Sequence, residues 1–99
     1  MFKDPVRSSD PLFTVLAVNN DRRLARLGLA ISKKTVSKAS QRNRIKRQIR
    51  ESFRHEQHKL LDIDIVVMAK RGLDNRSENE MRQSLQQHWA RLVKKCAKS

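Results

Sequence analysis

The chain has 99 residues, of which 23 are Lys or Arg and 10 are Asp or Glu, so its formal net charge is +13. This length fits one domain with a modest core, and a basic excess of this size is typical of proteins that bind polyanions. The longest apolar run is too short to span a membrane, no signal-peptide segment is present, and the one cysteine excludes an internal disulfide. We therefore expect a single cytoplasmic domain over residues 1–99.

The predicted elements begin, in chain order, with a short edge strand at 6–8. Residues 13–18 are apolar on both sides, which predicts a largely buried strand, and turn-forming residues separate it from a second strand at 27–32. Gly28 and Ala30 share one side of that second strand. This side of small residues indicates either close packing of a helix, which is the simpler explanation, or the approach of an extended nucleic-acid strand.

A central helix is expected next, with Ser37 or Ser40 as its N-cap and its end near residue 59. A third main strand covers 63–70. Ser77 and Glu80 have the spacing of a capping box, which predicts the start of a C-terminal helix. We expect Met81 and Trp89 of this helix to lie in the core. The residues that follow helical spacing in it are Met81, Leu85, His88, Trp89, Leu92 and Cys96.

The central helix is both amphipathic and strongly basic. Ile45, Ile49 and Phe53 fall at roughly 0°, 40° and 80° around it, whereas Lys46, Arg47, Asn43, Arg50 and Arg54 fall at roughly 100° to 200°. Between residues 33 and 54 there are nine basic residues and one acid. Arginine matches phosphate oxygens with a planar fork of donors, and an asparagine can contact a base edge or a ribose hydroxyl. The pattern therefore predicts a helix with one side on the protein core and the other on a nucleic acid.

Three segments together resemble the bacterial ribonuclease P protein component. Arg42-Asn43-Arg44 followed by Ile45-Lys46-Arg47 is similar to that family's RNR signature. Residues 27–34, which end in a lysine pair, are similar to the strand before it, and residues 64–70 to the strand after it. The resemblance covers about residues 2–92.

The resemblance implies an α/β fold, an α+β two-layer sandwich that is ribosomal-protein-S5-like. It has a mixed sheet, a central helix in a left-handed βαβ crossover and a packed C-terminal helix. It also implies the protein subunit of ribonuclease P, which binds a catalytic RNA and removes the 5′ leader from precursor tRNA, with Mg²⁺ held mainly by the RNA. The implied RNA-binding residues are Lys33, Lys34, Lys38, Arg42, Asn43, Arg44, Lys46, Arg47, Arg50 and Arg54. A leader cleft between the sheet and the central helix would be lined by Phe2, Phe13 and Leu16. Most of the family's N-terminal helix is expected to be absent, with residues 1–4 as its last turn.

No residue pattern points to catalysis by the chain itself. His55 and His58 have no evident third metal ligand, and Asp62 and Asp64 are more simply acids that shield a strand edge than a Mg²⁺ site. We expect no membrane partner, because a membrane-surface helix would have a wider apolar side with exposed Trp or Leu. We expect no DNA partner, because the basic helix lacks the partner helix of a helix-turn-helix. A generic RNA-binding module, such as a ribosomal protein or an RNA chaperone, is the alternative function.

Overall fold

The computed structural model describes residues 6–20 and 23–96. The elements in this part of the chain are β1 (Val6–Ser9), β2 (Phe13–Asn19), β3 (Arg26–Ala30), α1 (Ala39–Glu56), η1 (Gln57–Lys59), β4 (Ile63–Ala69), η2 (Leu73–Asn75) and α2 (Glu78–Cys96). Here η1 and η2 are single 3-10 turns. The predicted strands and helices are all present, with ends that differ by a few residues from those predicted. The predicted last turn of an N-terminal helix lies outside the described residues.

The four strands form one mixed sheet in the order β1-β2-β4-β3. β2 is antiparallel to both β1 and β4, whereas β3 is parallel to β4. The register places Arg7, Leu16, Val66 and Gly28 in one row across the sheet. Because side chains alternate along a strand, these four residues share one face of it.

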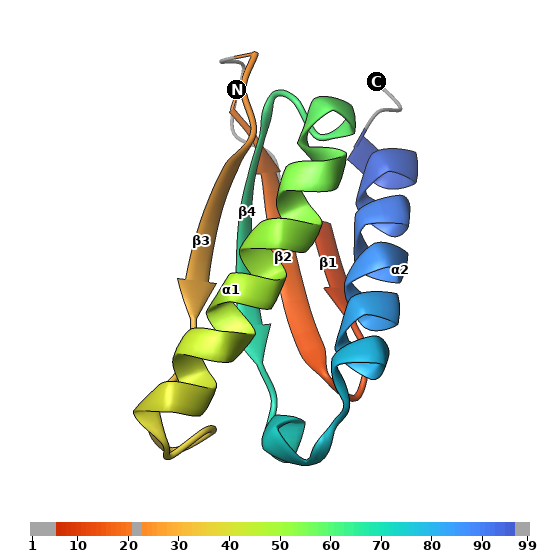
Figure 1. Cartoon of the computed structure of the whole chain (residues 1–99). Helices are drawn as coiled ribbons and strands as arrows, with labels where there is room; N and C mark the ends of the chain where they lie inside the picture. The colour runs from red at the N-terminus through yellow and green to blue at the C-terminus, as the bar shows by residue number, and fades with distance from the viewer. Residues whose placement is uncertain (1–5, 21–22, 97–99) are drawn as a thin grey trace.

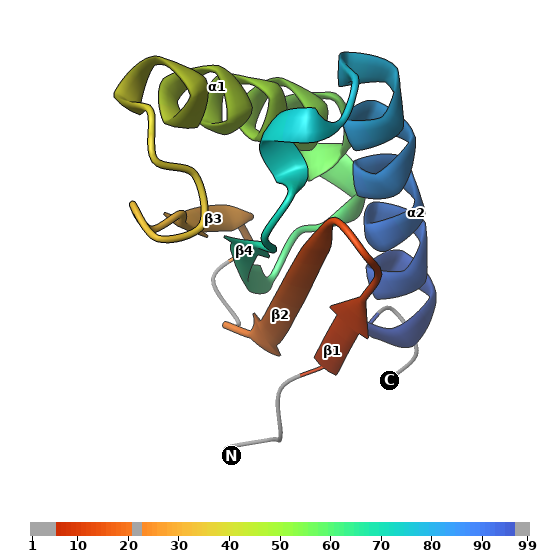
Figure 2. The same cartoon turned by 90° about the horizontal axis from the view of Figure 1, so that it is seen from below.

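The connection from β3 to β4 through α1 is a left-handed crossover. In Figure 1 both strands run downward, β4 lies to the right of β3, and α1 passes in front of the sheet. Such connections are right-handed in nearly all proteins, so this prediction from the family resemblance goes against the general rule and is confirmed. Figure 2 shows α1 and α2 on the same side of the sheet, which gives two layers, and within residues 6–20 and 23–96 no element covers the other face, called here the uncovered face.

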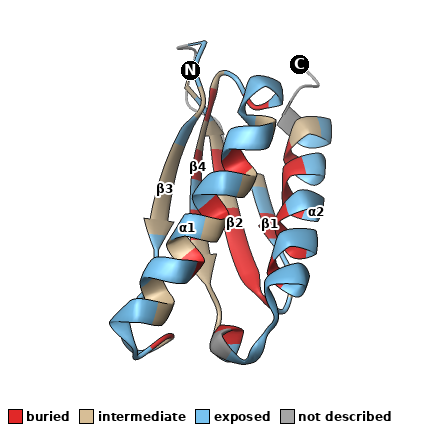
Figure 3. Ribbon diagram, in the orientation of Figure 1, coloured by how far each residue is buried: buried red, intermediate tan, exposed pale blue. Residues whose placement is uncertain are grey.

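The core fills the space between the helices and the sheet (Figure 3). The predicted stripe of Ile45, Ile49 and Phe53 is buried. The Phe53 ring packs edge-to-face on Trp89, with ring centroids 5.9 Å apart, and the indole Nε1–H of Trp89 donates a hydrogen bond of 2.8 Å to Ser52 Oγ. The buried side chains of β2 and β4 in this core are Phe13, Val15, Ala17, Ile63, Ile65 and Val67.

The two helices start in different ways. For α2 the predicted capping box is confirmed, because the Glu80 N–H donates to Ser77 Oγ at 3.1 Å and the Ser77 N–H donates to Glu80 Oε1 at 3.0 Å. For α1 both predicted caps are wrong: Lys38 occupies the N-cap position, and its side chain makes no capping hydrogen bond. The first turn of α1 also contains no acid.

Of the two roles expected for the small residues in β3, close packing of a helix is wrong. Leu27 and Leu29 pack against the core under the helices, so Gly28 and Ala30 point to the uncovered face of the sheet. A Cβ atom added to Gly28 would meet Val66 Cγ2 at 3.7 Å, which is an ordinary contact. Close packing of a helix therefore does not explain this glycine.

Candidate nucleic-acid interface

The outer side of α1 carries the predicted basic surface. With Ile45, Ile49 and Phe53 fixed in the core, the opposite side of the helix points to solvent (Figure 3). The predicted site residues that are exposed there are Asn43, Arg44, Arg47, Arg50 and Arg54, and Lys46 is half-buried beside them. Because one side of α1 is packed in the core, the guanidinium groups on its other side are arranged along the helix and face solvent.

Three lysines extend this surface beyond the start of the helix. Lys33 and Lys34 lie in the turn that follows β3, Lys38 is the N-cap residue of α1, and all three are exposed. The first N–H groups of a helix carry partial positive charge, and here no side-chain cap or acidic residue offsets it. The lysines and the helix end therefore add to the same positive potential.

Arg42 departs from the prediction because its side chain turns back toward the protein. Its Nη1 donates hydrogen bonds of 2.9 Å to the carbonyl oxygens of Val36 and Ser37, and the residue is half-buried. Helical spacing gave no sign of this, since the acceptors are backbone atoms of the preceding loop. The structure therefore separates Arg42 from the exposed arginines of the surface.

Arg44 is exposed but has an acidic neighbour that its own helix does not provide. Its Nε donates to Glu78 Oε2 in the first turn of α2 at 3.0 Å, and the two side chains are 69% and 49% exposed. An ion pair this open to water contributes little to stability. Sequence reasoning missed this contact, because the two residues are distant in the chain and meet only where α1 and α2 pack.

The predicted leader cleft between the sheet and the central helix is wrong in its location. Phe13 is completely buried and stacks edge-to-face on His88, with ring centroids 6.4 Å apart, so core side chains fill the space between sheet and helix. Leu16 lies on the other, uncovered face, because it alternates with the buried Val15 and Ala17. Phe2, the third predicted residue, lies outside the described residues.

The uncovered face of the sheet is largely apolar near its middle. Leu16 pairs with Val66, which is 40% exposed, and Val66 pairs with Gly28. Thr14, Met68 and Ala30 form the neighbouring row.

Comparisons with known proteins agree with this architecture. The sequence model of the Ribonuclease P family matches residues 1–93. The chain is 48% identical over 99 residues to the ribonuclease P protein component of Pseudoalteromonas atlantica, covering all of this chain and 82% of that protein. It is 46% identical over 96 residues to the protein of the same name from Pseudoalteromonas translucida, covering 97% of this chain and 69% of that protein.

The chain belongs to the ribonuclease P protein family. Solved structures support the assignment. The RNase P protein of Thermotoga maritima, in complex with 1-(4-fluorophenyl)-2-thiourea, superimposes with a TM-score of 0.80 at 28% identity, covering 88% of this chain and 85% of that one. The Staphylococcus aureus RNase P protein gives 0.78 at 33% identity, covering 95% and 82%. As a ribonuclease P component, the chain takes part in tRNA processing and has an RNA partner in a ribonucleoprotein.

The candidate metal ligands of this ribonuclease P protein are dispersed or already engaged. His55 and His58 are exposed near the end of α1. Asp64 accepts from Arg26 Nε and Nη2 at 2.8 Å each, and Asp62 accepts from the Arg23 backbone N–H. Asp64 belongs to β4 and Asp62 directly precedes it. Because β4 is a central strand, these acids do not shield an edge of the sheet. Within residues 6–20 and 23–96, no group of three or more His, Cys, Asp or Glu residues could hold a metal ion. None of the described helices is long and apolar enough to span a membrane.

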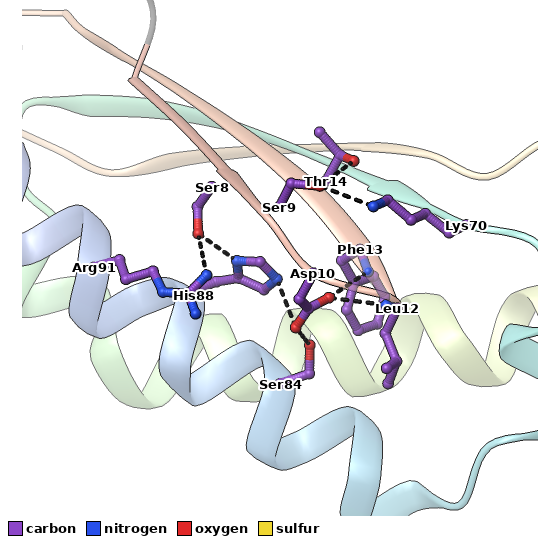
Figure 4. Close-up of polar contacts among 10 residues, drawn as sticks. All are labelled: Ser8, Ser9, Asp10, Leu12, Phe13, Thr14, Lys70, Ser84, His88 and Arg91. Carbon is purple, nitrogen blue, oxygen red and sulfur yellow. Dashed lines mark hydrogen bonds and ion pairs between the residues drawn. The ribbon is translucent and has the colours of Figure 1, made fainter.

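A buried polar network joins β1 to α2 (Figure 4). Ser8 Oγ lies 2.7 Å from His88 Nδ1, and His88 Nε2 lies 3.2 Å from Asp10 Oδ2, which also contacts Ser84. Arg91 donates to Ser8 Oγ, so the serine hydroxyl can donate to Nδ1, which leaves the imidazole proton on Nε2, facing Asp10. This order matches a Ser-His-Asp triad, but His88 is completely buried and Ser8 is 3% exposed. Without access for a substrate, the network is structural.

The same network shifts the protonation of its members. Burial by itself raises the pKa of Asp10, but hydrogen bonds from Ser84 and from the backbone N–H groups of Phe13 and Leu12, with the attraction of His88, more than offset it and lower this pKa to about 2. Burial lowers the pKa of His88, and the neighbouring Asp10 carboxylate only partly offsets this. Asp10 is therefore charged and His88 neutral at pH 7.

Proposed function

We propose that this chain binds the catalytic RNA of ribonuclease P through the outer side of α1 and the lysine turn before it, and assists removal of the 5′ leader from precursor tRNA. The observation that carries the proposal is the placement of the exposed arginines. They line one side of a helix whose other side is buried in the core. Such a helix presents phosphate-binding groups on a fixed backbone, so little backbone freedom is lost when RNA binds.

The uncovered face of the sheet is the proposed contact for the single-stranded leader. Leu16, Val66 and Gly28 offer a smooth apolar row, and Arg7 stands at the end of that row. The aliphatic side chain at position 16 offers the bases apolar contact and not aromatic stacking.

Catalysis is assigned to the RNA partner together with Mg²⁺. The acids and histidines described above offer this chain no cluster suited to holding the metal. The role of the chain is then electrostatic: its positive charge allows two polyanions, the catalytic RNA and the precursor tRNA, to approach each other.

The test is reconstitution with the ribonuclease P RNA of the same bacterium at low Mg²⁺, with cleavage of precursor tRNA as the readout. The native chain is expected to restore cleavage. A variant with Arg47, Arg50 and Arg54 all changed to Ala should stay folded and should lose stimulation, and its RNA binding should depend less on salt, by roughly 2–3 log units per log unit of salt. The charge-matched control changes three other exposed basic residues, Arg71, Arg82 and Lys94, to Ala.

Two results would contradict the proposal in different ways. RNA binding without any stimulation of cleavage would leave the generic RNA-binding module as the function. Equal salt slopes in the two triple variants would mean that total charge, and not the outer side of α1, determines binding.

A further inference from the structure

We propose that Arg42 is a positioning residue, which holds the turn that presents Lys33 and Lys34 to the RNA and does not contact the RNA itself. The inference rests on the proposed function and assigns to Arg42 a role different from that of the other arginines of α1. Its basis is the set of hydrogen bonds on either side of the lysine turn.

Arg42 closes the turn from the helix side. Its Nη1 donates to two successive carbonyl groups, Val36 O and Ser37 O, at 2.9 Å each, while its own backbone N–H donates to Lys38 O at 3.0 Å in the first turn of α1. The guanidinium group therefore links the first turn of the helix to the residues that directly follow the lysine pair.

The strand side of the turn is held by Ser32. Its carbonyl oxygen accepts from the N–H groups of Thr35 at 3.1 Å and Val36 at 3.0 Å, and its Oγ lies 3.0 Å from Thr35 Oγ1. Val36 is completely buried and anchors the turn in the core. Lys33 and Lys34 thus lie between a strand-side anchor and the Arg42 anchor, and both are exposed.

Arg42 differs in this respect from Arg47 on the same helix. Arg47 is exposed, and the structure gives it no hydrogen bond or ion pair with another described residue, so its donors face solvent. The two arginines have equal charge, but the Arg42 donors that bind the two carbonyl groups are not available to bind RNA. A turn held in place in the free protein saves the entropy cost of ordering two lysine-bearing residues on binding.

The test is a double-mutant cycle on binding of the ribonuclease P RNA. Arg42→Ala is expected to weaken binding about fivefold in the native chain but less than about twofold in a Lys33→Ala/Lys34→Ala background, because residues that act through one another are not additive. Arg47→Ala, the matched control, should weaken binding by the same factor in both backgrounds.

Arg42→Lys separates position from charge. Lysine keeps the charge, but its compact ammonium group does not reproduce the planar guanidinium fork. We expect an unchanged salt slope together with nearly the full loss of affinity seen for Arg42→Ala. In the RNA-free protein, both Arg42 variants should lose hydrogen-exchange protection at the Val36 amide while the thermal melt stays cooperative, a readout that does not depend on RNA.

Several outcomes would overturn the proposal. Equal effects of Arg42→Ala in the two backgrounds would show that Arg42 contacts the RNA directly, and full affinity in Arg42→Lys would show that only charge matters. If Lys33→Ala/Lys34→Ala leaves affinity unchanged, the turn has no role in binding, although RNA binding through α1 would still stand on the Arg47→Ala result. Absence of RNA binding by the native chain would refute the proposed function itself.

Discussion

Phe53→Ala is expected to remove a large part of the stability of this domain. The side chain is 7% exposed, and its ring packs on Trp89 at the point where α1 meets α2. A buried phenylalanine removes roughly 150–250 Å² from water, worth about 4–6 kcal/mol at roughly 25 cal/mol per Å². Alanine keeps some of this contact and the core relaxes in part, so we expect a loss of about 3–5 kcal/mol. The whole stability of a domain is typically about 5–15 kcal/mol.

Thermal unfolding followed by circular dichroism measures this loss. In a domain of this size each kcal/mol corresponds to roughly 4–8 °C, so Tm should fall by at least about 12 °C. Arg54→Ala is the control, because Arg54 is the next residue on the same helix but exposed, and its removal should change stability by less than about 0.5 kcal/mol. A fall of only one or two degrees for Phe53→Ala would refute the assignment of the 45-49-53 stripe as the anchor of α1.

Two further predictions follow from contacts between elements. Glu78→Gln should strengthen RNA binding by up to about fivefold at low salt, because it frees Arg44 from an internal carboxylate, and the effect should largely vanish in an Arg44→Gln background. Because the pKa of His88 is lowered in the native protein, the unfolded chain takes up a proton at a higher pH than the native protein does. The free energy of unfolding should therefore be constant above pH 6.5, the ordinary pKa of histidine. Below pH 6.5 it should fall by up to about 1.4 kcal/mol per pH unit. Denaturant unfolding between pH 7.5 and 5.5 tests this. A flat profile in the native chain would contradict the role of His88.

Features that depend on residues three or four apart could be predicted from the sequence. The stripe of Ile45, Ile49 and Phe53 and the capping box of Ser77 and Glu80 are both of this kind, because the geometry of one helix turn determines which side chains meet. Once the apolar side of α1 is known, the exposure of its basic side follows. The strands could also be located, because short apolar runs between turn-forming residues are typical of buried strands.

The sequence did not reveal which face of the sheet the helices would cover. That choice depends on how the apolar sides of α1 and α2 pack on the sheet. The helices cover the face that carries Phe13, Val15 and Ala17, so Phe13 lies in the core and not in the predicted cleft, whereas Leu16 and Gly28 lie on the uncovered face.

Contacts between distant segments were also decided by tertiary structure alone. Ser8 and His88 are 80 residues apart and Arg44 and Glu78 are 34 apart, and no local pattern pairs such residues. Arg42 is the clearest case, because its side chain binds backbone oxygens that every loop possesses. Only the path of the chain places two of those oxygens within reach of its guanidinium group. The sequence therefore predicts a basic helix, and the packing of that helix decides which of its arginines face solvent.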